Sequence, residues 1–341
     1  MRLTWSVTTL RLREPFHTSR GVTGEREAVE VAVEHDGVIG HGEVVTSRYY
    51  QLDVAAIATV LARLSPVVAA CRSEAELRAT LPGLRLTHPD TLAVIAAVDA
   101  AAHDLIGRAN GLAAHRVLGT PPVAGPRTAY TIGLRGPRDA AIEAARLVGR
   151  GFGVLKLKLG RDDDVAVVAA VRSAAPDVTL LLDPNGGWDA DTASRRLDAL
   201  AGYGIAAVEQ PVRHGHLALL TRVAARSPIP VIADEDARTA DDVGRLAGLV
   251  HGVNVKLVEC GGLGGAVEMA RTAKALGMQV MLGCLASSTL SVAPAVHLAG
   301  LARWLDLDGH LLLAEDPWTG IGGTDGTLTQ PTSPGLGVRR R

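Results

Sequence analysis

The stretch Gly153-Val154-Leu155-Lys156-Leu157-Lys158-Leu159-Gly160 indicates both the fold and the chemistry of this chain. Side chains two residues apart in a β-strand point to the same face, so Lys156 and Lys158 should project together from an apolar strand. The chain has only four lysines, and 31 of its 35 basic residues are arginine. A third lysine, Lys256, lies in another apolar run. A single lysine on a strand often extends its amine into water, but three lysines in apolar strands favour one shared site.

The sequence after residue 123 alternates short apolar strands with helical stretches. Polar or glycine positions near the C-terminal ends of the expected strands recur every 22 to 27 residues, at Thr131, Lys156, Asp183, Glu209, Asp234, Lys256, Gly283 and Asp306. Eight such steps predict a closed parallel barrel rather than an open sheet. The last step leaves no room for a full helix. We therefore predict an α/β fold with a TIM-like (β/α)7β barrel.

Three segments divide the chain. Residues 1–123 are predicted to form an α+β capping domain, residues 124–317 the barrel with the active site, and residues 318–341 a tail that returns to the capping domain. Within the capping domain the apolar patterns predict strands over 3–13, 28–34 and 38–44 and helices over 54–64 and 91–108. Proline and glycine between Pro121 and Pro126 mark the linker.

Composition excludes several classes of protein. With 47% hydrophobic and 21% charged residues and a net charge of -1 over 341 residues, the chain has no basic field for nucleic acid or an anionic membrane. Its three cysteines form no CxxC pattern, and the N-terminus has no apolar signal core. The charge-free stretch 276–302 favours a buried strand and helix over a membrane span. We expect a cytoplasmic protein that forms a homo-oligomer.

Three carboxylates end consecutive expected strands: Asp183, Glu209 and Asp234. The C-terminal ends of barrel strands meet at one face, where active sites lie. Converging carboxylates repel one another and call for a cation, and an all-oxygen set points to Mg²⁺, with Mn²⁺ next. The alternative, carboxylates that cap the following helices, suits one or two of them but not all three.

Lysines come from the strand before this triad and from the strand after it. Burial, and for Lys156 and Lys158 the neighbouring like charge, should lower their pKa values toward the range useful for proton transfer. A metal that holds a carboxylate stabilises the enediolate formed when the α-proton leaves. A base on each face then allows inversion of that carbon. The residues thus predict proton abstraction next to a carboxylate.

The sequence resembles the enolase superfamily, and within it the muconate lactonizing enzyme subgroup. The resemblance spans nearly the whole chain and rests on Gly40-His41-Gly42-Glu43, the segment 97–119, the Lys-x-Lys strand, the three carboxylates and Lys256. It implies that Lys158 and Lys256 are the two acid/base residues and that Lys156 supports Lys158 electrostatically. It also implies a barrel without a regular last helix.

The substrate is suggested by Trp304-Leu305-Asp306-Leu307-Asp308-Gly309, which resembles the Asp-x-Asp motif of dipeptide epimerases. Asp306 and Asp308 share a strand face and are expected to pair with a substrate ammonium, with Thr131 as a further contact. Arg20, in an expected capping loop over residues 17–24, is a candidate for a second substrate carboxylate. The resemblance therefore implies a Mg²⁺-dependent dipeptide epimerase that inverts the α-carbon of the C-terminal residue.

Three alternatives stay open at this point. The nearest is an o-succinylbenzoate synthase or a muconate-type cycloisomerase of the same fold, whose substrates carry no ammonium. A second is a Schiff-base aldolase, because barrel lysines can also attack carbonyls, although the carboxylate triad argues against it. A third is a binding protein on an inactive barrel, which should have lost a ligand or a lysine.

Overall fold

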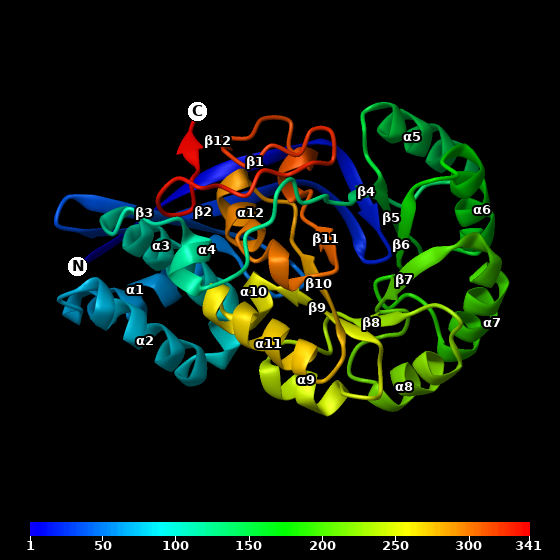
Figure 1. The fold of residues 1–341 in the computed structure, drawn as a ribbon. Coiled ribbons are helices and arrows are strands. Elements are labelled where there is room, and N and C mark those ends of the chain that lie inside the picture. The colour runs from blue at the N-terminus through cyan, green and yellow to red at the C-terminus, as the bar shows by residue number, and fades with distance from the viewer.

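The computed structural model describes the backbone of all 341 residues and every side chain except that of Pro89. Eight parallel strands lie in sequence order around a barrel (Figure 1). They are β4 (Tyr130–Ile132), β5 (Val154–Lys158), β6 (Thr179–Asp183), β7 (Ile205–Glu209), β8 (Val231–Ala233), β9 (Gly252–Lys256), β10 (Gln279–Gly283) and β11 (Trp304–Asp306). Thr128 bridges Leu305 in parallel and closes the ring. The predicted barrel is confirmed.

Seven of these strands are followed by a helix, because each parallel crossover must return over the outside of the barrel. The helices are α5 (Pro137–Gly149), α6 (Asp164–Ala174), α7 (Ala190–Leu200), α8 (Leu217–Arg226), α9 (Ala240–Leu246), the short α10 (Leu257–Cys260) with α11 (Leu263–Ala275), and α12 (Thr289–Val296). After β11 the chain makes only a 3₁₀ turn over Gly309–Leu312. The (β/α)7β order is therefore confirmed as well.

The first 118 residues build a separate sheet with its own apolar core. An antiparallel meander of β1 (Arg2–Thr18), β2 (Gly21–His35) and β3 (Val38–Val45) packs against α1 (Val54–Ala70), α2 (Glu74–Thr87), α3 (Leu92–Ala109) and α4 (Ala114–Leu118). Two sequence interpretations were incomplete. The expected loop over 17–24 is largely the tip of the β1–β2 hairpin, and α2 was not predicted.

The C-terminal segment runs back along the capping elements (Figure 1), where β12 (Trp318–Thr319) pairs with β13 (Arg339–Arg340). Trp318 Nε1 donates to Glu30 Oε1 of β2 at 3.1 Å, and the Leu336 N–H donates to Asp104 Oδ1 of α3 at 2.7 Å. Buried acceptors on two capping elements thereby hold the end of the chain.

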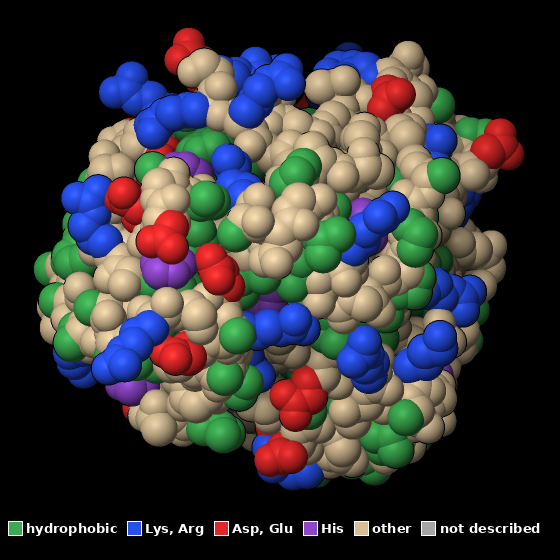
Figure 2. Space-filling model, turned by 60° about the vertical axis from the view of Figure 1, so that its left-hand side comes forward, with side chains coloured by type: hydrophobic (Ala, Val, Ile, Leu, Met, Phe, Trp, Pro, Cys, Tyr) green, Lys and Arg blue, Asp and Glu red, His purple; other side chains and the backbone are tan. Residues whose placement is uncertain are grey.

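The charge-free stretch 276–302 is divided between β10 and α12, as predicted. Of the helices that the structure describes, none combines the length and the apolar character that a membrane crossing requires. Figure 2 shows Lys and Arg side chains scattered among Asp and Glu over one face rather than gathered in a single patch. This distribution agrees with the net charge of -1.

Glu43 of β3 joins the two domains and makes stability depend on pH. Its carboxylate accepts hydrogen bonds from the N–H and the hydroxyl of Ser288, and burial outweighs these bonds and raises its pKa to about 7. Because the folded-state pKa lies above the unfolded value of 4.5, the contribution of this carboxyl to stability is complete below pH 4.5 and is lost as the pH rises through 7.

Glu43→Gln keeps the shape, and its amide can accept from the Ser288 N–H and donate to the Ser288 hydroxyl oxygen. We therefore expect this variant to lack the decrease in unfolding free energy, at most about 3 kcal/mol, that the wild type shows between about pH 5 and pH 8. Urea unfolding of the wild type and the variant at both pH values measures this difference. A difference between the two proteins that stays constant with pH would contradict the assignment.

Candidate active site

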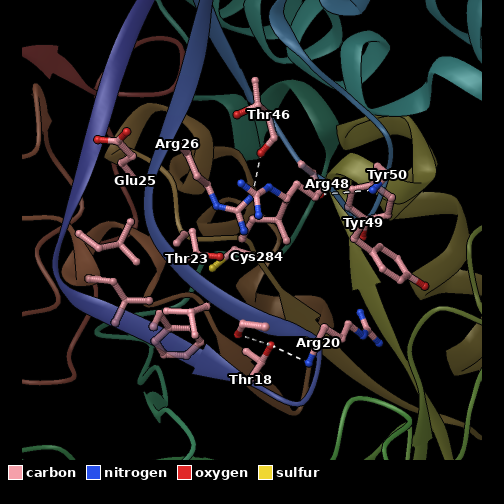
Figure 3. Close-up of a pocket in the computed structure, with 18 of the residues that line it drawn as sticks. Thr18, Arg20, Thr23, Glu25, Arg26, Thr46, Arg48, Tyr49, Tyr50 and Cys284 are labelled. Atoms are coloured by element: carbon pink, nitrogen blue, oxygen red, sulfur yellow. Dashed lines mark hydrogen bonds between the residues drawn. The ribbon is translucent and has the colours of Figure 1, made fainter.

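A cavity of about 1110 Å³ lies between the C-terminal ends of the barrel strands and the capping domain. Its floor comes from the barrel, and its roof comes from the β1–β2 hairpin and the loop after β3 (Figure 3). Seven residues predicted from the sequence line it: Arg20, Thr131, Lys156, Lys158, Lys256, Asp306 and Asp308. The three predicted carboxylate ligands contact the lysines on this floor.

Lys156 is the centre of the floor and is 1% exposed. Its Nζ lies 2.6 Å from Asp306 Oδ2, 2.5 Å from Glu209 Oε2 and 3.1 Å from Asp183 Oδ2. Lys158, two residues on, also bonds Asp183, its neighbour in the register of β5 and β6. The two amines thus project to one side of the strand, as the spacing predicted.

Lys256 approaches from the other side of the carboxylates. Its ammonium pairs with Asp234 and lies 3.8 Å from Glu209 Oε1. Because β5 and β9 flank β6, β7 and β8 in the barrel, the lysines stand on both sides of the three acidic strand ends. A substrate carbon held above those ends would have an amine on each face.

The pKa shifts of Lys156 and Lys256 are opposite to the expected direction. Burial does disfavour the ammonium of Lys156, but Asp306, Glu209 and Asp183 outweigh it and hold the pKa well above the usual range. Burial likewise opposes the charge of Lys256, and the nearby carboxylates, Asp234 first, raise its pKa. The sequence interpretation weighed burial and like charge but not ion pairs this close.

The three carboxylates have the properties of a hard-cation site. Burial raises the pKa of both Glu209 and Asp234 to about 7, whereas Lys158 and Lys156 overcome burial at Asp183 and lower its pKa. Asp234 Oδ1 is buried and accepts no hydrogen bond from the residues that the structure describes, and Glu209 Oε2 is buried with the Lys156 ammonium 2.5 Å away. These oxygen acceptors outnumber their donors, which fits Mg²⁺ or Mn²⁺.

The acidic side chains are not yet gathered around one point. Among the described residues, no three His, Cys, Asp or Glu side chains already have the spacing of a complete metal site. The lysines account for this, because Lys158 pairs with Asp183, and Lys156 and Lys256 each contact two of the three carboxylates. A cation would share these oxygens with the ammonium groups or displace them.

Two residues that support the carboxylates were missed in the sequence. Asn254, which is fully buried on β9, donates from Nδ2 to Glu209 Oε1 at 2.9 Å. Gln210 follows Glu209 with a positive φ of 35°, and its Oε1 accepts from the Asp234 N–H at 2.9 Å. Asn254 could have been found, because it lies two residues before Lys256 on the same strand face.

Asp306 and Asp308 form the acidic end of the cavity, beside Thr131 of β4. Thr131 donates from its backbone N–H to Asp308 Oδ2 at 2.6 Å and from its hydroxyl to Asp306 Oδ1 at 3.1 Å. Burial, reinforced by the charge of Asp306, raises the pKa of Asp308 to about 7. Asp306 has Lys156 as a counter-ion, so Asp308 has the greater need of a cation from the substrate.

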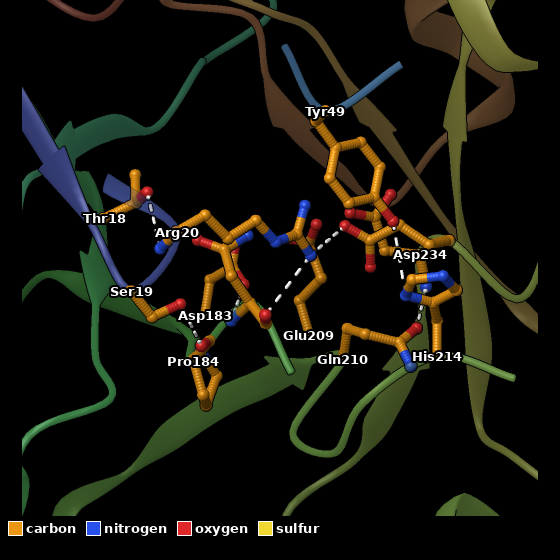
Figure 4. A network of polar contacts seen from close by, with 12 residues as sticks. Thr18, Ser19, Arg20, Tyr49, Asp183, Pro184, Glu209, Gln210, His214 and Asp234 are labelled. Carbon is orange, nitrogen blue, oxygen red and sulfur yellow. Dashed lines mark hydrogen bonds and ion pairs between the residues drawn. The ribbon is translucent and has the colours of Figure 1, made fainter. Parts of the chain in front are cut away.

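The capping domain reaches the site through two segments (Figure 4). Arg20, at the hairpin tip, pairs with Glu235, donates to the Asn185 carbonyl at 3.2 Å and stacks 4.3 Å above the Tyr49 ring. Arg20 therefore lines the cavity, but its guanidinium is engaged by a barrel carboxylate.

The second segment is the loop after β3. The Tyr50 hydroxyl donates to Glu259 of α10, a carboxylate that is 1% exposed and lies one helical turn after Lys256. The Tyr49 hydroxyl lies 3.3 Å from Nδ1 of the exposed His214. The loop is thus fastened to the barrel beside a predicted acid/base residue.

Comparison with known families gives two matches that together cover most of the chain. The model described as mandelate racemase / muconate lactonizing enzyme, N-terminal domain, matches residues 2–119. The model described as enolase C-terminal domain-like matches residues 139–341.

Individual relatives are similar over most or all of their length. An L-Ala-D/L-Glu epimerase of Bacteroides thetaiotaomicron is 32% identical over 341 residues, covering 100% of this chain and 88% of the relative. An L-Ala-D/L-amino acid epimerase of Maribacter is 28% identical, with 99% of each chain covered. The crystal structure of an Enterococcus faecalis dipeptide epimerase with Mg and L-Leu-L-Tyr has a TM-score of 0.94 at 27% identity, with 99% of each chain covered. The substrate side chains differ among these proteins.

Proposed function

This chain belongs to the mandelate racemase/muconate lactonizing enzyme family of enolase-like proteins, and from that premise we propose that it is a Mg²⁺-dependent dipeptide epimerase. The observation that carries the proposal is the placement of Lys158 and Lys256 on opposite sides of three buried carboxylates. Dipeptide epimerases with this fold are its relatives. The reaction inverts the α-carbon of the C-terminal residue.

The two lysines exchange the α-proton. One amine removes the proton from one face of the carbon, and the opposite ammonium returns a proton to the other face. The base must be neutral, which would become easier once the carboxylates that raise the lysine pKa values share their charge with the cation. Inversion requires that the two groups differ in protonation at the start and exchange roles when the reaction runs backwards. Lys156, held by three carboxylates, keeps a fixed positive charge beside Lys158.

Asp183, Glu209 and Asp234 would hold the Mg²⁺ ion, with Mn²⁺ as a substitute. When bound, the ion supplies positive charge that stabilises the carboxylate of the substrate as the α-proton leaves. Asn254 and Gln210 orient two of the ligands through the hydrogen bonds described above. Asp306 and Asp308 would receive the α-ammonium, and Thr131 holds both carboxylates in place.

Proton NMR in D₂O with Mg²⁺ tests the proposal directly. A panel of L,L-dipeptides with acidic, neutral, basic and aromatic side chains is incubated with the enzyme. We expect the α-proton signal of the C-terminal residue to disappear and the L,D diastereomer to accumulate, and EDTA to prevent both. Dehydration of succinylhydroxycyclohexadiene carboxylate without exchange of any dipeptide would favour the lyase alternative instead.

Tyr50 should affect substrate binding more than chemistry. Tyr50→Phe removes the donor to a buried carboxylate, a bond worth about 1.5–3 kcal/mol. The loop should then close less firmly, so we expect KM for the best dipeptide to rise roughly tenfold with little change in kcat. Tyr49→Phe is the matched control, because its partner His214 is exposed. Equal effects of the two substitutions would argue against a role for Tyr50 in loop closure.

We further place the enzyme in the cytoplasm as a homo-oligomer. The three cysteines carry no disulfide in the structure, and two of them are buried, which is compatible with a reducing compartment. Size-exclusion chromatography with light scattering measures the oligomeric state, and a monomer at micromolar concentration would exclude the oligomer.

A further inference from the structure

We infer that Arg26 recognises an acidic side chain of the dipeptide, an inference that rests on the proposed function. Arg26 lies on β2 and contributes to the roof of the cavity whose floor carries the lysines and Asp308 (Figure 3). The relatives differ in the side chains they accept. The side-chain preference of this chain therefore depends on the residues of its own cavity.

The Arg26 side chain is half-buried, and its guanidinium has no counter-ion among the residues that the structure describes. One nitrogen, Nη1, donates to the Thr46 carbonyl at 2.7 Å, whereas Nε is buried and has no acceptor among the described residues. The neighbouring glutamates are used elsewhere, because Glu25 faces Arg11 at 3.9 Å and Glu27 accepts from the Thr9 hydroxyl at 3.0 Å. Burial accordingly lowers the pKa of Arg26. A half-buried cation with a buried, unused donor is costly unless an anion joins it.

Arg20, the arginine predicted from the sequence to bind a substrate carboxylate, already has a counter-ion in the structure. Its ion pair with Glu235 outweighs the effect of burial and raises its pKa. A substrate carboxylate would have to compete with a side chain that is itself almost fully buried. Arg26 offers an unused donor in the same cavity, so it is the better candidate for a carboxylate.

The charges of the cavity agree with this assignment. Asp306 and Asp308 form an acidic end suited to an ammonium. Arg26 and the exposed Arg48 add positive charge to the roof, which also carries Glu25 and Glu27, with Arg11 3.9 Å from Glu25. A dipeptide with one acidic side chain carries an ammonium and an additional carboxylate that match these two regions. The planar guanidinium can bind that carboxylate through two parallel hydrogen bonds.

Paired substrates that differ only in side-chain charge provide the test: L-Ala-L-Glu with L-Ala-L-Gln, and L-Glu-L-Ala with L-Gln-L-Ala. In one of these two substrate pairs the acidic residue should reach Arg26. For that pair we expect the wild-type kcat/KM to be at least about 30-fold higher for the Glu peptide than for the Gln peptide, because the Gln peptide lacks a partly buried ion pair. Arg26→Gln should reduce this ratio to within threefold, mainly by lowering kcat/KM for the Glu dipeptide. Arg26→Lys should retain part of the preference, and Arg11→Gln, at an exposed position of β1, should retain all of it.

Calorimetric binding of the same peptides with Mg²⁺ separates this inference from the proposed function. Tighter binding of the acidic peptide that depends on Arg26, without any epimerisation, would support the inference and overturn the function. Epimerisation of neutral dipeptides with no preference for Glu at either position would support the function and overturn the inference. A preference for Glu that survives in Arg26→Gln would also overturn it.

Discussion

Replacement of Lys158 by alanine should lower dipeptide epimerisation by about 10³-fold or more, because a positioned acid or base contributes about 10²–10⁴ to the rate. Lys256→Ala should cause a loss of the same order. Inversion needs both amines, so neither variant should interconvert the L,L and L,D forms. Each should still exchange the α-proton of the one diastereomer that its remaining lysine faces, without inverting it.

NMR in D₂O measures both quantities, exchange and inversion, in the same sample. Lys274→Ala is the matched control, since Lys274 is the fourth lysine of the chain and lies exposed on α11. Binding of Mn²⁺, followed by its electron paramagnetic resonance signal, shows whether each variant keeps the carboxylate site. Loss of exchange with both diastereomers in a single variant that still binds Mn²⁺ would contradict the assignment of one lysine to each face.

The barrel could be predicted from the sequence because its strands are buried on both sides and recur at a nearly constant interval. The polar residue that ends each strand lies at the same face of the barrel, so the carboxylates and lysines could be grouped without knowing any distance. The common direction of Lys156 and Lys158 could be predicted because side chains two residues apart in a strand point to the same face.

Neither the helix α2 nor the contacts between the domains could be predicted in this way. The helix α2 has buried leucines at positions 77, 81 and 84 and a cap at Ser73, but Pro82 and Gly83 lie in its middle and argue locally against a helix. The pairing of Arg20 with Glu235 joins residues 215 positions apart. Nothing near Arg20 in the sequence reveals that its charge is already balanced, just as nothing near Arg26 reveals that its charge is not.

The pKa values of the lysines show a second limit of the same kind. Burial alone lowers the pKa of an amine, whereas three carboxylates at ion-pair distance raise it. The net pKa shift depends on distances of a few ångströms between strands that are far apart in the sequence. Lys156 and Asp306, for example, are 150 residues apart. Periodicity predicts that these residues share a face but gives no such distance.

Asp308→Asn should lower kcat/KM for dipeptides by about 100-fold, in the range expected when one partner of a buried charge pair is removed. The amide can still accept the hydrogen bond of the Thr131 N–H through its oxygen, so the fold of the site should be kept. It cannot balance an ammonium. Asp308 is a cleaner test than Asp306, because Asp306 also holds Lys156 at 2.6 Å.

The same carboxylate predicts how binding depends on pH. Because the pKa of Asp308 is raised to about 7, the ionised form that pairs with an ammonium gains population as the pH rises through 7. The wild-type KM should therefore fall between about pH 6 and pH 8, and this fall should be absent in Asp308→Asn. Steady-state kinetics of both proteins over that range measures it. A variant that keeps the dipeptide activity of the wild type would mean that no ammonium binds there, and substrates without one, as in the lyase and cycloisomerase alternatives, would then fit the cavity better.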